Sequence, residues 1–224
     1  MSKEYHLNIP FSEEEAKALE IGDVVYVSGI IHTLRDMAHA RVAEMLRNGE
    51  PLPFDLASSA IWHAAPVVYQ DENGKWHTPS AGSTTSSRYT PLGAEILEKL
   101  KMRATIGKGT MKQPAIEVMK KIGSVFLNTT GGTAALYAQK VEEIEAAHWL
   151  ELGLPETVWV MRVKEFGPLI VGIDSRGASL YDNMREAVNL RLKEQFEKAG
   201  ISIEKCYTCL PVSIPGESRQ FTSK

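Results

Sequence analysis

Three segments of the chain share one order of features: a predicted strand, then a turn rich in glycine and hydroxyl residues, then a stretch with helical character. The turns read AGSTTSSR at 81–88, IGKG at 106–109 and TTGGT at 129–133. Strands that alternate with helices favour an α/β fold, in which helical crossovers connect the strands of a sheet. We therefore expect an α/β domain, preceded by a portion richer in β-structure.

The first two turns also carry a cation each. Backbone N–H groups at a helix start lack partners within the helix, and Gly82 lets a ligand approach the backbone closely. Arg88 can grip a carboxylate through two hydrogen bonds, and Lys108 adds a second positive charge. This pattern favours a small polyanionic ligand, although glycine, serine and threonine are also ordinary helix caps and loop residues.

The nature of the anion can be narrowed. Lys108 is not followed by the serine or threonine of a phosphate-binding P-loop, and no Gly-x-Gly-x-x-Gly pattern occurs. We therefore expect carboxylate groups rather than a nucleotide.

The composition is that of an ordinary globular protein. The chain has 224 residues, of which 43% are hydrophobic and 24% charged, and a net charge of −3. Nucleic-acid binders usually show a strong basic bias, so no nucleic acid is expected as a partner. No apolar stretch is long enough for a membrane span, and the acidic start does not resemble a signal peptide, so we expect a cytoplasmic protein.

Local patterns predict most elements. Ser12 and Glu15 form a capping-box pattern for a short helix, and residues 71–75 predict a hairpin turn. Further helices are expected over 35–47, ended by the residues NGEP at 48–51, and over 91–101, 114–122 and 133–140. Strands are expected over 23–33, 60–69, near 105, and over 124–128. Strands over 158–163 and 169–174 are expected to form a hairpin around 166–168, followed by a helix with an apolar stripe of Met184, Val188, Leu192 and Phe196. We expect a single domain over 1–224, with a poorly ordered tail after about residue 215.

The two cysteines are Cys206 and Cys209. Two thiolates are too few to hold zinc or an iron–sulfur cluster alone, and no histidine lies nearby in the sequence. We therefore expect reduced, unlinked thiols and no metal bound by this chain.

A larger ordered set of motifs is more specific than any single turn. It comprises residues 22–29 (GDVVYVSG), 33–39 (TLRDMAH), 82–88 (GSTTSSR), 106–109 (IGKG), 131–135 (GGTAA), 151–153 (ELG) and 173–177 (IDSRG). From about Gly22 to Tyr181 the chain resembles the β subunit of class I, iron–sulfur-dependent fumarate hydratase and L(+)-tartrate dehydratase. The resemblance implies a swivelling β/β/α domain, like the mobile domain of aconitase-type hydro-lyases.

The resemblance also implies a function. In that family a separate α subunit binds a [4Fe-4S] cluster, and the two subunits add or remove water on a short dicarboxylate such as fumarate, malate or tartrate. This chain would be the β subunit, in a complex that is a heterotetramer by the family pattern. Two alternatives stay open: a stand-alone dicarboxylate-binding or regulatory module without lyase activity, and a scaffold whose glycine turns are only caps.

The motifs imply roles for individual residues. Arg35, Arg88 and Lys108 match the carboxylate-binding cations of the family, and Thr84 matches its proposed catalytic base. We expect His39 to orient the turn at Arg35. The supporting residues are expected to be Asp36, beside Arg35, together with His39, Gly82, Ser83, Thr85, Gly107 and Gly109.

Overall fold

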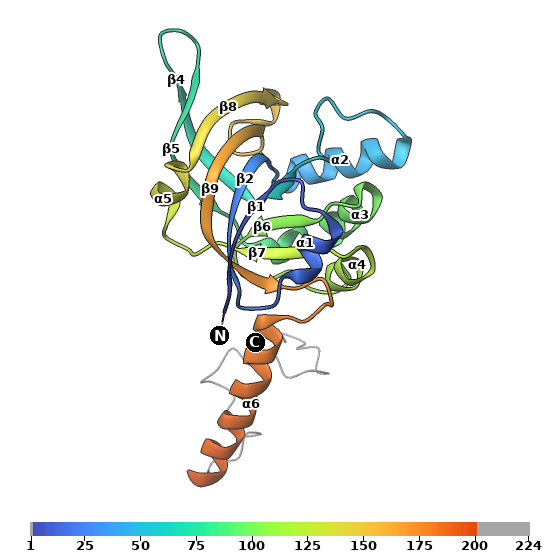
Figure 1. The fold of residues 1–224 in the computed structure, drawn as a ribbon, viewed down its shortest axis with the longest axis vertical. Coiled ribbons are helices and arrows are strands. Elements are labelled where there is room, and N and C mark those ends of the chain that lie inside the picture. The colour runs from blue at the N-terminus through green and yellow to red at the C-terminus, as the bar shows by residue number, and fades with distance from the viewer. Residues whose placement is uncertain (1, 201–224) are drawn as a thin grey trace, which may run out of the picture. The chain divides into compact units, whose positions relative to one another are not determined.

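The computed structural model describes residues 2–200 (Figure 1). The strands are β1 (Glu4–Asn8), β2 (Val24–Thr33), β3 (Ala60–Trp62), β4 (Ala64–Gln70), β5 (Trp76–Ser83), β6 (Ala104–Gly107), β7 (Val125–Asn128), β8 (Val141–His148) and β9 (Val158–Ile173). The helices are α1 (Glu13–Ala18), α2 (Asp36–Asn48), α3 (Thr90–Leu100), α4 (Ala115–Ile122), α5 (Ala134–Ala138) and α6 (Leu180–Lys198), with short 3₁₀ helices at Ser86–Tyr89 and Leu150–Leu152. The expected α/β class is confirmed.

The main sheet closes on itself. Its strands follow the order β1-β2-β3-β6-β7-β9-β8, and β2 pairs in addition with β9. Strands β1, β2, β3, β6 and β7 are parallel to their neighbours in this series, whereas β9 is antiparallel to β2, β7 and β8. The pairings β2–β3–β6–β7–β9–β2 therefore form a ring, and β4 and β5 form a separate hairpin that projects from it (Figure 1).

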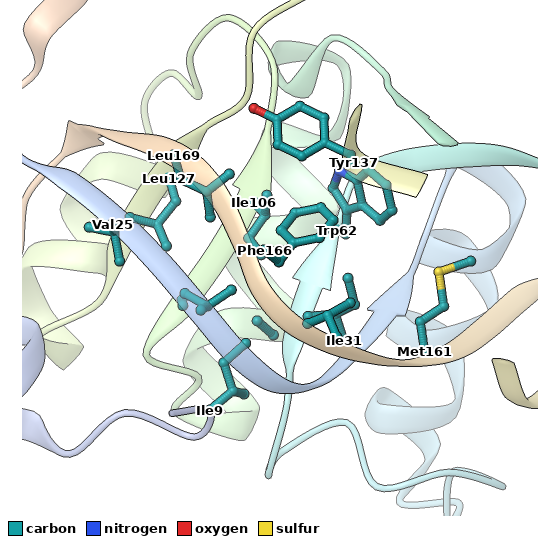
Figure 2. Close-up of a cluster of buried hydrophobic side chains, with 14 of the residues drawn as sticks. Ile9, Val25, Ile31, Trp62, Ile106, Leu127, Tyr137, Met161, Phe166 and Leu169 are labelled. Atoms are coloured by element: carbon teal, nitrogen blue, oxygen red, sulfur yellow. The ribbon is translucent and has the colours of Figure 1, made fainter. Parts of the chain in front are cut away.

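The inside of this ring is a hydrophobic core. Side chains alternate along each strand, so Ala60 and Trp62 point into this core while Ile61 joins the cluster on the other face. Trp62 and Phe166 meet edge to face, with ring centroids 4.8 Å apart, and Tyr137 of α5 packs on Phe166 at 5.0 Å (Figure 2). Aromatic side chains from β3, β9 and α5 thus fill the space that the strands enclose.

A second core lies between the outer face of the sheet and three helices. Helices α2, α3 and α4 contribute Val42, Leu97 and Met119, and the sheet contributes Ile61 and Phe126. In Figure 1 these helices lie together on one side of the sheet. Helices α2 and α4 connect the parallel pairs β2–β3 and β6–β7, and α3 follows the β4–β5 hairpin in the connection from β3 to the parallel strand β6.

Several expected elements agree with the structure. Ser12 caps α1 in a complete capping box with Glu15, and Gly49 ends α2 in the left-handed conformation, with φ at 72°. The predicted helices and strands between residues 91 and 140 are all present within one to two residues at most ends, although α5 is shorter than expected.

Two predictions about strands differ from the structure. The strand expected over 60–69 is broken at His63, where the chain leaves the closed sheet and enters the β4–β5 hairpin. The hairpin expected around 166–168 is wrong, because β9 runs unbroken from Val158 to Ile173. Strand β2 pairs with both halves of β9, and the register shifts on each side of the pair formed by Val27 and Phe166. Strands β1 and β8 were not expected.

The chain divides into two compact units, Met1–Tyr181 and Asp182–Lys224. Most of α6 belongs to the second unit, and its predicted stripe is not buried within the described residues: Met184 is 56% and Val188 57% exposed. None of the helices within residues 2–200 is both long and apolar enough to cross a bilayer. Cys206, Cys209 and the tail after residue 215 lie outside the described residues.

Candidate functional site

The predicted site residues gather at one edge of the closed sheet. Strands β2, β3, β6 and β7 are adjacent and parallel, so their carboxyl ends lie at the same edge. The residues just beyond these ends are Arg35, His63, Lys108 and Thr129. Loops at the carboxyl ends of parallel strands are the usual place for a ligand site in α/β proteins.

The turn that contains Thr84 passes between two of these strand ends. The Thr84 N–H donates to the carbonyl of His63 at 2.7 Å, and the Ser86 N–H donates to the carbonyl of Lys108 at 2.9 Å. Thr85 and Lys108 form a parallel β-bridge. The structure thus brings Thr84 and Lys108, which are 24 positions apart in the sequence, into adjoining backbone segments.

Arg88 is tied to the start of α2 by an ion pair. Its Nη2 lies 2.5 Å from Oδ2 of Asp36, and this hydrogen bond holds the pKa of Arg88 above its ordinary value. Asp36 was expected to support Arg35, whose Nη2 is farther away, at 3.9 Å. Asp36 therefore lies between the two predicted carboxylate-binding arginines and is bonded more closely to Arg88.

Arg35 has a second acidic neighbour. Its Nε lies 3.7 Å from Oε1 of Glu156, while Oε2 of Glu156 accepts a 2.8 Å hydrogen bond from the Met37 N–H at the first turn of α2. The Nε of Arg35 is buried and makes no hydrogen bond to any of the residues 2–200. The Arg35 side chain retains 22% exposure. It is thus held between acidic groups but has donor capacity left for an anion.

Lys108 is the predicted cation with the fewest local restraints. It is half-buried, and no carboxylate within the described part of the chain forms an ion pair with it. A Cβ added to Gly131 would lie 3.4 Å from Cδ of Lys108, so the third glycine turn passes beside the Lys108 side chain. Since the first turn also contacts Lys108 through Thr85 and Ser86, all three turns meet at this residue.

The hydroxyl and glycine residues of the turns have varied surroundings. Ser83 Oγ accepts a 2.7 Å hydrogen bond from Nε1 of the core residue Trp62, which anchors the turn from below. A Cβ added to Gly82 would lie 3.4 Å from the Cβ of Ala134, so the two residues pack closely. Gly109 adopts a positive φ of 78°. Ser83 and Gly82 thus shape the first turn through a bond to the core and close packing, and Gly109 shapes the second turn through its backbone conformation.

Two buried histidines, His39 and His63, pack against the ring of Tyr89. His39 stacks on Tyr89, with centroids 4.7 Å apart and planes at 2°, and His63 lies 4.7 Å from the same Tyr89 ring. His39 Nδ1 bonds the Arg35 carbonyl at 2.8 Å, as expected for a residue that orients the Arg35 turn. Burial lowers the pKa of His39 to about 4 and the pKa of His63 well below its ordinary value, so both rings are neutral near pH 7.

Four neighbours of the site were not expected from the sequence: His63, Ser86, Tyr89 and Glu156. His63 directly follows the end of β3. The sequence did not reveal this position, because it predicted one unbroken strand over 60–69. Glu156 belongs to no motif, and only the tertiary structure brings it to α2.

Metal ligands do not cluster in the described structure. Within residues 2–200, no three histidine, cysteine, aspartate or glutamate side chains come together as a metal site. These residues therefore do not fit a [4Fe-4S] cluster. A hollow of about 420 Å³ between β2 and β8 is lined by His32, Phe54 and His148 among others and contains none of the predicted site residues.

Comparison with known proteins gives a consistent result. Residues 1–184 match the family model described as "Fumarase C-terminus". The chain is 41% identical over 192 residues to the putative L(+)-tartrate dehydratase subunit beta of Methanocaldococcus jannaschii, covering 85% of this chain and 97% of that protein. It is 42% identical over 174 residues to the L(+)-tartrate dehydratase subunit beta of Escherichia coli, covering 78% and 85% of the two chains.

A longer relative also matches. Over 192 residues the chain is 39% identical to the putative class I fumarate hydratase of Geobacillus stearothermophilus, and the match covers 86% of this chain but 36% of that protein. A unit of this size is thus found both as a separate chain and as part of a longer one. The family model and these relatives show that the chain belongs to the fumarase C-terminal family.

Proposed function

We propose that this chain is the β subunit of a two-subunit hydro-lyase that reversibly adds or removes water on a short dicarboxylate. Membership in the fumarase C-terminal family and the names of its relatives support this activity. The observation that carries the proposal is the convergence of Arg35, Arg88 and Lys108, on three separate loops, at one edge of parallel strands. Fumarate/malate is the first substrate pair to test, and tartrate/oxaloacetate the second.

The cations would bind the two carboxylates. Arg35 and Arg88 can each present a planar fork to a carboxylate, whereas Lys108 offers a point charge. Asp36 and Glu156 neutralise part of this charge in the free chain. One carboxylate of a bound diacid would take the place of Asp36 at Arg88, and Lys108 would be a further partner of the diacid.

Thr84 would move the proton at the carbon next to the one that carries the hydroxyl group. A threonine hydroxyl is ordinarily a poor base, so its deprotonated form must be stabilised. The cations Arg88 of the same turn and Lys108 of the adjoining turn would favour that form electrostatically. The Thr84 N–H itself already donates to His63 and is not available for this purpose.

The cofactor and the partner are part of the proposal. We propose that a [4Fe-4S] cluster is held by an α subunit, since the described residues supply no ligand set for it. The complex would be a cytoplasmic heterotetramer. Names of relatives that contain "subunit beta" support the existence of a partner chain.

The experiment is anaerobic co-expression and co-purification with the candidate α subunit, identified as a neighbouring gene product with three cluster-ligand cysteines. The purified complex is assayed with fumarate, L-malate, L-tartrate and mesaconate, each subunit alone serving as the control. Activity that requires both chains is the expected result. A complex that forms but acts on none of these acids would contradict the proposal, and binding of a diacid by this chain without turnover would favour a binding module.

A further inference from the structure

His63 connects three segments of the site edge although it lies below the surface. It is the single residue between β3 and β4, and none of its surface is exposed. Its N–H donates to the carbonyl of Ile106 on β6 at 2.9 Å, and its carbonyl accepts from the Thr84 N–H at 2.7 Å. Its backbone alone thus links the end of β3 to β6 and to the turn at Thr84.

The His63 side chain adds a further link to the same turn. Nδ1 lies 2.8 Å from Oγ of Ser86, which is also fully buried. The Ser86 N–H in turn donates to the Lys108 carbonyl at 2.9 Å. Ser86 is therefore fixed from two sides, by the imidazole through its hydroxyl and by the Lys108 segment through its backbone.

Gly107 provides the space for this contact. A Cβ added there would collide with Ser86 Oγ and would lie 3.1 Å from His63 Nδ1. The close approach of the β6 backbone leaves His63 and Ser86 in direct contact. Gly107 was expected to support the ligand site. In the structure its lack of a side chain leaves room for the hydrogen bond between His63 and Ser86.

The imidazole stays neutral in this environment. Burial lowers the pKa of His63, and the nearby His39 lowers it further. The ring exposes no surface through which it could contact a ligand at the loops. Its contacts instead reach the turn that contains Thr84 and Arg88 and the segment that contains Lys108.

We propose that His63 is a positioning residue: through its hydrogen bond to Ser86 it holds the 84–88 turn against the Lys108 turn. Its effect on turnover rests on the proposed function, whereas its effect on the order of the turn does not. A residue that supports the groups in contact with a ligand commonly changes activity by about 10- to 100-fold when it is replaced.

The chain offers a matched pair for the test. His32 Nδ1 lies 2.8 Å from Ser59 Oγ, and both residues are buried, as in the His63–Ser86 pair. His32 lies on β2 and belongs to a different part of the molecule from the Thr84 turn. Ser86→Ala and Ser59→Ala therefore each remove a buried histidine–serine hydrogen bond with the loss of one oxygen atom. Ser59 Oγ also donates to the Leu56 carbonyl at 2.9 Å, so Ser59→Ala is the more disruptive of the two and a stringent control.

The first measurement is hydrogen–deuterium exchange on the full-length chain, with peptides covering residues 83–89. We expect Ser86→Ala to speed amide exchange in this peptide at least about tenfold and Ser59→Ala to leave it unchanged. Equal exchange of the two variants in this peptide would overturn the proposal. Neither partner nor substrate is needed, so this result is independent of the proposed function.

The second measurement uses the assembled complex. We expect Ser86→Ala and His63→Leu to lower kcat by about 10- to 100-fold. His63→Asn places an amide near the position of Nδ1 and should restore most of the loss. Failure of His63→Asn to exceed His63→Leu, in variants that fold and assemble equally, would overturn the role of the hydrogen bond. An inactive wild-type complex would instead contradict the proposed function and leave the exchange result standing.

Discussion

Arg88 Nη2 and Asp36 Oδ2 lie 2.5 Å apart, and this ion pair joins the turn after β5 to the first turn of α2. Both side chains are partly exposed, at 49% and 41%. A carboxylate of a bound diacid would compete with Asp36 for the same guanidinium group. In the proposed function, Asp36 would thus both support Arg88 and compete with the substrate for it.

Replacement of Asp36 by asparagine separates these two effects. Asp36→Asn should lower KM, because the competing negative charge is gone, and should lower kcat about tenfold, because Arg88 is held less firmly. Steady-state kinetics of the complex checks this, with Asp71→Asn in the β4–β5 turn as the control. A rise in KM at unchanged kcat would contradict the competition.

Thr84 is the residue on which turnover most depends in the proposed function. Thr84→Val keeps the branched shape but removes the hydroxyl, and we expect kcat to fall at least about 100-fold, as for loss of a general base. Assembly with the partner should be unaffected. Thr78→Val in β5 is the matched control, and a Thr84→Val complex with more than a tenth of wild-type kcat would rule out this role.

Arg35 should need its planar fork. Arg35→Lys retains the charge but loses the two parallel donors, so we expect KM for the diacid to rise about tenfold or more, with a smaller change in kcat. Arg47→Lys, at the other end of α2, makes the same substitution away from the site and should be neutral. Equal KM values for both variants would count against carboxylate binding by Arg35.

The closed sheet should depend on its aromatic core. Phe166 is fully buried against Trp62 and Tyr137 (Figure 2), and Phe166→Ala should lower the free energy of unfolding by about 3–5 kcal/mol. Val67→Ala, on a hairpin residue that is 60% exposed, should cost less than about 0.5 kcal/mol. Urea unfolding measures both values, and similar losses would contradict the described packing.

Stability should fall in mildly acidic solution because of the buried His39. The pKa of His39 is about 4 in the folded chain and 6.5 ordinarily, so below pH 6.5 the unfolded chain takes up a proton that the folded chain does not. The contribution of His39 is therefore complete above about pH 6.5 and is lost as the pH decreases toward 4, by about 3 kcal/mol.

Urea unfolding between pH 7 and pH 5 tests this with two variants. His39→Asn should flatten the decrease in the free energy of unfolding. His6→Gln should have the opposite effect on the slope, because hydrogen bonds to Glu165 and Glu4 raise the pKa of His6 and its contribution is lost as the pH increases. An unchanged slope in His39→Asn would contradict the buried neutral ring.

The sequence predicts well where local signals decide the structure. The capping box at Ser12 and the terminal glycine at Gly49 involve residues close together in the chain, and both lie where expected. The hairpin at 166–168 failed for the opposite reason. A Gly-Pro pair usually marks a turn, but β2 pairs with β9 on both sides of it and imposes one strand. That partner is more than 130 positions away.

The candidate site shows the same division. Arg35, Thr84, Arg88 and Lys108 stand in motifs, and the structure places all four at loops of one edge. His63 and Glu156 stand in no motif, because their importance comes from tertiary contacts with Ser86 and α2. A pattern of residue types can nominate candidate ligand-binding groups, but it gives little information on the groups that hold them in place.

The shared edge of β2, β3, β6 and β7 has a consequence for how such a protein changes over time. The strands supply the buried core, whereas the predicted ligand-binding side chains stand on the connections that follow them. Substitutions in these connections can retune which acid is accepted without unfolding the frame. The choice of ligand and the stability of the fold can therefore evolve almost independently in this architecture.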